Sequence, residues 1–184
     1  MQCARLLVGL LVFALGVSLL GALMGAFNVS ATEPHWPTTL QVISFIRERS
    51  IRKRANQEKA PHLGDAGRIR AGFHRYQEMC VTCHSAPGRG DSVIRIGLNP
   101  QSPLLTESRV QERPDADLCW IIKHGIRMTV MPAFGKTHSD DQIWDLVAFV
   151  RHLAQMSAEE YKTWDRHGAG ERSHDDHGHR HDYE

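Results

Sequence analysis

Residues 80–84 read Cys-Val-Thr-Cys-His, and this short stretch decides how the rest of the chain is interpreted. Two cysteines three positions apart project from one side of a helical turn, so both sulfur atoms can bond to one macrocycle. The histidine follows directly and can ligate a metal at the centre of that macrocycle. The pattern is typical of covalent haem attachment, with Cys80 and Cys83 holding the haem and His84 as the proximal iron ligand.

Two other interpretations of the cysteine pair are weaker. A zinc site needs a second pair of ligands, and neither Cys119 nor the scattered histidines supply one at a recognisable spacing. A dithiol redox centre normally accompanies a βαβ pattern, which the sequence lacks. Cys119 is expected to be a small buried residue within a helix, and Cys3 has no evident partner.

Helical patterns surround the cysteine pair on both sides. Residues 66–79 predict a helix that runs directly into it. Residues 114–124 carry the start and stop signals of a short helix, and residues 139–155 combine a capping box with one apolar stripe. The intervening residues 85–110 are rich in Gly, Pro and Ser and predict a long loop. Since strand patterns are few, the expected fold class is all-α.

From about residue 66 to residue 155, the chain resembles the class I cytochromes c of the membrane-anchored, single-haem, proteobacterial kind. The resemblance rests on Gly72 and Tyr76 before the haem motif, on Met131-Pro132 after it, and on the final helix. It implies three to five short helices around one covalently bound haem c. It also implies an electron-transfer protein rather than an enzyme, with redox proteins as partners and no small-molecule substrate.

The resemblance further implies how the first and last helices of the domain meet. In that family they cross at a contact between a glycine and an aromatic residue. Gly72 has no side chain and would let Phe149 or Trp144 approach.

Three residues of the stretch HGIRMTVMPAFG offer a ligand for the iron on the side opposite His84: His124, Met128 and Met131. Met131 is favoured because the following proline biases it toward extended geometry, and because the resemblance places a methionine ligand there. Met128 is expected to be a packing residue, and His124 to end a helix, where a cationic imidazole interacts well with the dipole. Ligation by Met and His raises the haem reduction potential.

The second ring nitrogen of His84 is expected to donate to a backbone carbonyl, which would orient the ring. The resemblance implies that this carbonyl belongs to a proline in the loop after the haem motif. Pro100 and Pro103 are both candidates.

The composition is that of an ordinary globular protein, with 184 residues and 41% hydrophobic residues. The formal net charge of +1 indicates no nucleic-acid partner. Local positive charge flanks the methionine loop at Lys123, Arg127 and Lys136. These cations either form a rim that steers an acidic partner or are merely solvated.

The N-terminal residues 6–27 are uncharged and apolar, long enough to span a bilayer as a helix. We favour an uncleaved anchor over a removed signal peptide, although Val29-Ser30-Ala31 has the composition of a cleavage site. Five basic residues follow within residues 47–54, which by the positive-inside rule opposes export of the downstream part. Haem attachment decides the orientation, because in bacteria it occurs outside the cytoplasmic membrane. The expected location is therefore that membrane, crossed once, with the haem domain in the periplasm.

The expected organisation has four parts: an anchor over residues 1–30, a linker with a basic helix over 31–64, a cytochrome c domain over 65–156, and a short helix with a disordered tail over 157–184. The basic helix, residues 38–56, either presents a solvated face or touches anionic lipid headgroups.

The C-terminal tail is polar and rich in histidine. Its candidate ligands for copper, nickel or zinc are His174, His177, His179 and His181. Two alternative functions follow: an accessory role in metal handling through this tail, and a haem sensor or peroxidase with a displaceable sixth ligand. Met131 with its proline argues against the second.

Overall fold

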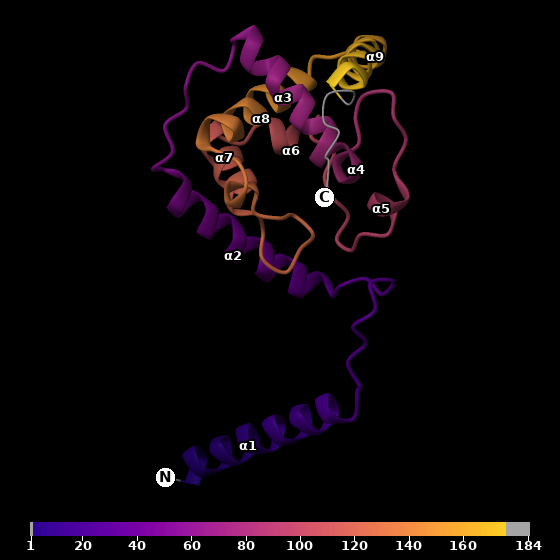
Figure 1. Ribbon diagram of the computed structural model, residues 1–184. Helices are drawn as coiled ribbons and strands as arrows, with labels where there is room; N and C mark the ends of the chain where they lie inside the picture. The colour runs from indigo at the N-terminus through magenta and orange to yellow at the C-terminus, as the bar shows by residue number, and fades with distance from the viewer. Residues whose placement is uncertain (1, 176–184) are drawn as a thin grey trace, which may run out of the picture. The chain divides into compact units, whose positions relative to one another are not determined.

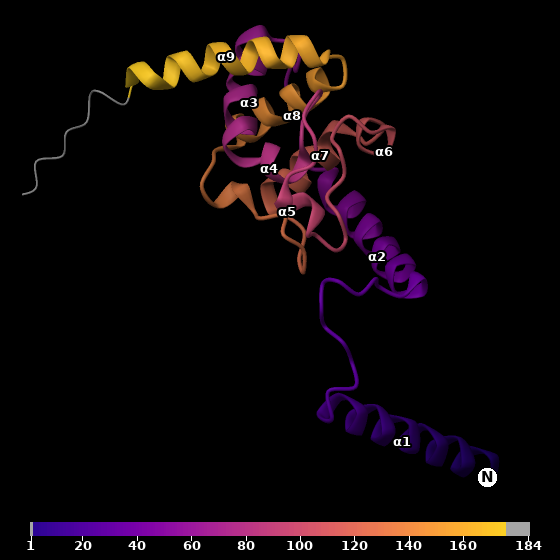
Figure 2. The same ribbon diagram turned by 90° about the vertical axis from the view of Figure 1, so that its right-hand side faces the viewer.

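The computed structural model describes the backbone of residues 2–175 and the side chains of residues 2–166. It separates into two units, Met1–Pro34 and His35–Glu184. The described residues form helices and no strand (Figures 1 and 2). The expectation of an all-α protein is therefore confirmed.

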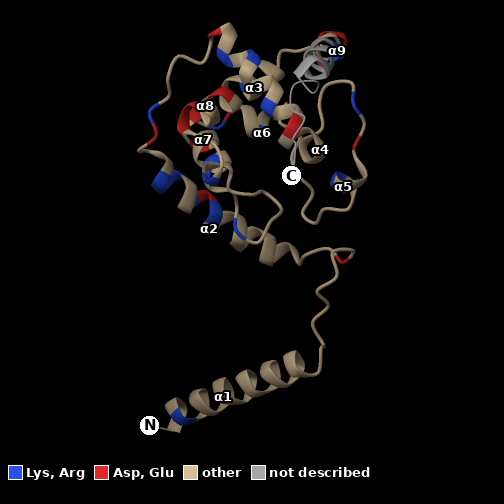
Figure 3. Cartoon of the chain, in the orientation of Figure 1, with Lys and Arg blue, Asp and Glu red and all other residues tan. Residues whose placement is uncertain are grey.

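The first unit contains one helix, α1 (Gln2–Leu23). An 18-residue window of this 22-residue helix has a mean hydropathy of 2.6, as in a membrane-spanning helix or a signal sequence. Figure 3 shows that α1 is almost free of charged residues.

The second unit carries the remaining helices, and the expected helices before, between and after the candidate ligands are confirmed. They are α2 (Pro37–Ala55), α3 (Ala66–Met79), α4 (Val81–His84), α5 (Val93–Ile96), α6 (Ser108–Gln111), α7 (Asp115–His124), a 3₁₀ turn η1 (Phe134–Lys136), α8 (Asp140–Leu153) and α9 (Ala158–Asp175). The loop expected over residues 85–110 contains two single helical turns, α5 and α6. Helix α9, which begins the segment expected to hold a short helix and a tail, extends to Asp175.

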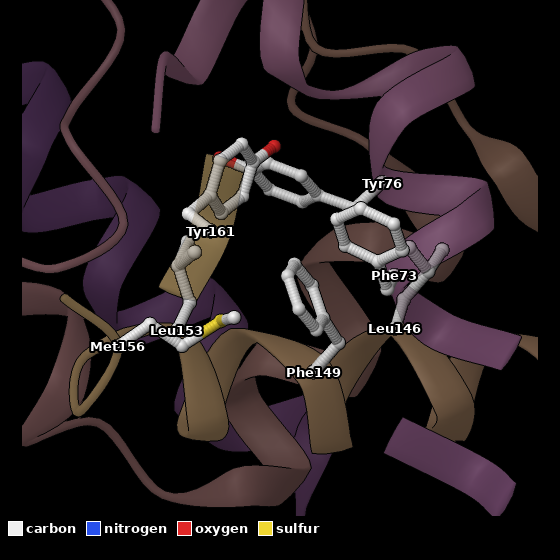
Figure 4. Packing of buried hydrophobic residues seen from close by; sticks show 7 residues of the cluster. All are labelled: Phe73, Tyr76, Leu146, Phe149, Leu153, Met156 and Tyr161. Atoms are coloured by element: carbon white, nitrogen blue, oxygen red, sulfur yellow. The ribbon is translucent and has the colours of Figure 1, made fainter. Parts of the chain in front are cut away.

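Helix α8 begins with the capping box that its sequence predicts. The Ser139 hydroxyl accepts from the backbone N–H of Gln142, and the Gln142 side chain accepts from the N–H of Ser139. Its apolar stripe packs against α3, and the two helices bury an aromatic cluster that α9 completes (Figure 4). The cluster consists of Phe73, Tyr76, Leu146, Phe149, Leu153, Met156 and Tyr161.

The crossing of α3 and α8 depends on Gly72. A Cβ built there would lie 2.0 Å from the carbonyl oxygen of Asp145 and 2.8 Å from the Cβ of Phe149. The glycine–aromatic contact is therefore present, with Phe149 rather than Trp144 as the partner. Asp145 also ties the two helices by ion pairs with Arg68 (2.8 Å) and Arg75 (3.1 Å).

Helix α2 packs against α7, a contact that the sequence did not indicate. Ile51 and Ala55 are buried at the contact, at 2% and 0% exposure. Glu48 receives two hydrogen bonds from the guanidinium of Arg113, both 2.7 Å long. The guanidinium holds the pKa of Glu48 below its ordinary value. The basic helix is thus part of the second unit, His35–Glu184.

Candidate functional site

The cysteine turn is a direct continuation of α3 into α4. The backbone N–H of Cys80 donates to the carbonyl of Tyr76 (2.9 Å), and that of His84 donates to the carbonyl of Cys80 (2.9 Å). Both cysteines are free thiols and partly buried. Burial and the neighbouring Cys83 raise the pKa of Cys80 to about 12. The turn therefore presents two thiols and one imidazole on a single short segment.

The backbone after His84 is held by Tyr76. The Tyr76 hydroxyl donates to the carbonyl of Ser85 (2.5 Å), and Ser85 is itself buried with a positive φ of 57°. The Ser85 hydroxyl donates in turn to the carbonyls of Arg89 (3.1 Å) and Gly90 (3.2 Å). Tyr76 contributed to the resemblance, but its sequence position alone gave no sign of this role.

The imidazole of His84 is oriented by Pro103. Its Nδ1 lies 2.8 Å from the Pro103 carbonyl oxygen, so Pro103 rather than Pro100 is the partner. Burial lowers the pKa of His84 below its ordinary value. The hydrogen bond to Pro103 raises this pKa, and the charge of Arg95 lowers it further. A neutral imidazole whose Nδ1 donates to a carbonyl has Nε2 available as a metal ligand.

The methionine loop lies against the end of α7 because of Gly125. This residue has a φ of 65°, and a Cβ there would lie 2.6 Å from the carbonyl oxygen of Met131. The Ile126 N–H donates to that same carbonyl (3.1 Å), and the Met131 N–H donates to the Thr129 hydroxyl (3.1 Å). These contacts close the loop and leave Met131 partly buried.

The other two candidates from that stretch occupy different surroundings. Met128 is 96% exposed, and its expected packing against the haem edge stays a prediction. His124 ends α7 as expected, and its ring lies 5.0 Å from that of Trp120. It borders a cavity between α2 and α7, together with Trp120 and Lys53.

Arg95 is a buried cation that sequence reasoning missed. It is 6% exposed, pairs with Asp91 through one terminal nitrogen, and has no hydrogen-bond acceptor for its buried Nε. Its charge reaches His84, whose pKa it lowers. A buried donor without an acceptor is costly, so this position is suited to an anionic group.

Two further predictions concern the cations beside the methionine loop and an accessory metal site. Lys123, one of the three cations that either form a positive rim or are merely solvated, pairs with Asp140 (2.8 Å) and Glu58 (3.5 Å). No group of three His, Cys, Asp or Glu side chains within residues 2–166 is arranged to hold a metal ion. The tail histidines 174, 177, 179 and 181 have side chains outside the described residues.

Comparison with known proteins identifies the segment that contains the site. Residues 67–150 match the family described as cytochrome C oxidase, cbb3-type, subunit III. No curated protein matches the chain significantly. The matched segment includes the cysteine turn and the methionine loop, and it excludes α1, α2 and α9.

Proposed function

We propose that this chain, whose residues 67–150 form a class I c-type cytochrome domain with covalently bound haem c, carries single electrons between redox proteins at a membrane. The observation that carries the proposal is the cysteine turn with its oriented histidine. His84 follows the two thiols directly and is fixed through Nδ1 by Pro103 at 2.8 Å.

The described residues fit a haem in three respects. Two free thiols lie one helical turn apart. The histidine has its second nitrogen satisfied and Nε2 free for iron. Buried Arg95 lacks an acceptor for its Nε, and the carboxylates of a haem supply acceptors of the right charge.

Each residue then has a distinct role. Cys80 and Cys83 would hold the haem by thioether bonds, and His84 and Met131 would ligate its iron. When bound, the haem iron supplies one-electron chemistry by alternating between the ferric and ferrous states. Met131 contributes a neutral thioether, which favours the ferrous state and raises the potential. The hydrogen bond from the Ile126 N–H to the Met131 carbonyl (3.1 Å) fixes the backbone that carries this side chain.

We assign the haem domain to the periplasmic side of a bacterial membrane, with α1 as the anchor. Two features support the assignment: the length and hydropathy of α1, and the covalent attachment chemistry, which takes place outside the cytoplasm. Anchoring raises the effective concentration of the domain near membrane-bound redox partners.

The proposed function predicts a reversible electron carrier with a closed sixth coordination position. We expect the purified full-length protein to keep its haem on a denaturing gel. In a potentiometric titration it should show a single redox couple that involves one electron. The ferrous form should not bind carbon monoxide, and the ferric form should not turn over peroxide. Rapid carbon monoxide binding with peroxide turnover would instead favour the sensor or peroxidase alternative.

Arg95 is expected to raise the haem potential. Replacing it, Arg95→Gln, removes a buried cation that opposes the positive charge gained on oxidation, so the midpoint potential should fall by tens of millivolts, on the order of 1 kcal/mol. Spectroelectrochemical titration measures the shift. The matched control is Arg109→Gln, which also removes an ion-paired arginine, but one with a 65% exposed side chain. Equal shifts in the two variants would show that burial of Arg95 has no special effect.

A further inference from the structure

The N-terminal half of α2 presents large apolar side chains to its surroundings. Residues 37–46 include no charged residue, and the four most exposed apolar side chains within them are between 52% and 65% exposed. Trp36, directly before the helix, is 74% exposed. We call this set the apolar face of α2: Trp36, Val42, Ile43, Phe45 and Ile46.

The C-terminal half of the same helix is docked on the haem domain and carries the charged residues of α2. It holds α2 on the haem domain through buried Ile51 and Ala55 and through the Glu48–Arg113 pair. It is also strongly basic, and Figure 3 shows charge on this half of α2 only. The apolar face is therefore a rigid extension of the haem domain that the domain itself does not cover.

Three observations indicate that a lipid surface covers the apolar face of α2. Only residues 24–36 separate α1 from α2, and 13 residues span at most about 45 Å. The face begins with a tryptophan, a residue that favours the membrane–water interface. It is followed by Arg49, Arg52, Lys53 and Arg54, which suit anionic headgroups.

A contact between a cation and an aromatic ring joins the apolar and the basic half of α2. The guanidinium of Arg49 lies over the ring of Phe45, 5.8 Å from its centre. A cation on a long apolar stem beside an aromatic ring allows the ring to enter the acyl boundary while the charge stays at headgroup level.

We propose that the apolar face of α2 lies in the interfacial region of the lipid bilayer. It would form a second membrane contact, in addition to that of α1. The inference rests on the membrane anchoring that the proposed function includes. Since α2 is docked on α7, this contact would hold the haem domain at the membrane surface in a restricted set of orientations.

The test measures how fast single cysteines react with a charged, membrane-impermeant maleimide. Full-length haem-loaded Cys3→Ser protein is reconstituted into phosphatidylethanolamine–phosphatidylglycerol vesicles at less than one copy per vesicle. Cys119 is 0% exposed, and Cys80 and Cys83 are bonded to haem. Val42→Cys and Phe45→Cys report the apolar face, and Arg52→Cys is the control in the basic half of the same helix.

We expect positions 42 and 45 to react at least tenfold more slowly than position 52. Equal rates in protein that floats with the vesicles would overturn the proposal for α2 and leave the anchor intact. Protection that develops only at several copies per vesicle would overturn it in favour of a second copy of the chain. Protein that fails to float would overturn the lipid contact and the anchor together, while the haem spectrum would still test electron transfer separately.

Discussion

Met131→Ala is expected to abolish the weak near-infrared sulfur-to-iron band of the ferric protein and to lower the haem potential. The fall should be on the order of 100 mV or more, since axial ligands set haem potentials across roughly 0.8 V. The physical reason is the loss of a neutral thioether that stabilises ferrous iron. Near-infrared absorption and a potentiometric titration of the same sample measure both effects.

Met128→Ala is the matched control for this experiment. Met128 is three residues away in the same loop, but it is 96% exposed, so its replacement should leave both the band and the potential unchanged. A band that survives Met131→Ala and disappears in Met128→Ala would transfer the ligand assignment to Met128. Carbon monoxide should bind to the ferrous Met131→Ala protein, because the sixth position is then open.

Gly72→Ala is expected to cost at least about 3 kcal/mol in the free energy of unfolding. The added Cβ would lie 2.0 Å from a backbone carbonyl oxygen of α8 and 2.8 Å from Phe149 Cβ. The backbone of α8 cannot rotate away from the added Cβ as a side chain could. The two helices must therefore separate, which loosens the aromatic cluster between them. Denaturant unfolding of the haem-loaded protein, followed in the haem absorption band, measures the loss.

Gly67→Ala in the same helix provides the comparison. A Cβ there meets only the end of the Asp65 side chain, at 3.2 Å, and alanine is the better helix former. Its effect should stay within about 1 kcal/mol of the parent protein. If Gly72→Ala were as mild as Gly67→Ala, the close approach of α3 and α8 at this point would not matter for stability.

The parts of the fold that the sequence predicted are those with local signals. Helix α3 coincides with its predicted range, and the capping box of α8 formed as expected. The contact between Gly72 and α8 was also foreseen, though only through resemblance to a family, because nothing local distinguishes Phe149 from Trp144. That choice depends on which side chain the helix crossing brings over the glycine.

What the sequence could not predict depends on contacts between distant segments. Pro103 and Pro100 lie three positions apart in one loop, and only the folded path of that loop brings one carbonyl to His84. The burial of Arg95 likewise follows from tertiary packing, since its neighbours in sequence are exposed apolar residues. The basic helix expected over residues 38–56 corresponds to α2, but its pairing with Arg113 spans 65 positions and has no local signal.

If α1 is the membrane anchor, as proposed, the docking of α2 also sets how far the haem domain can travel from it. With α2 held on α7, only residues 24–36 act as a tether, whereas a free α2 would lengthen the tether to residues 24–65. For a flexible chain, end-to-end distance grows as the square root of length, so the volume searched would be about sixfold larger. The ion pair between Glu48 and Arg113 thus helps to determine how often the haem meets a partner in the same membrane.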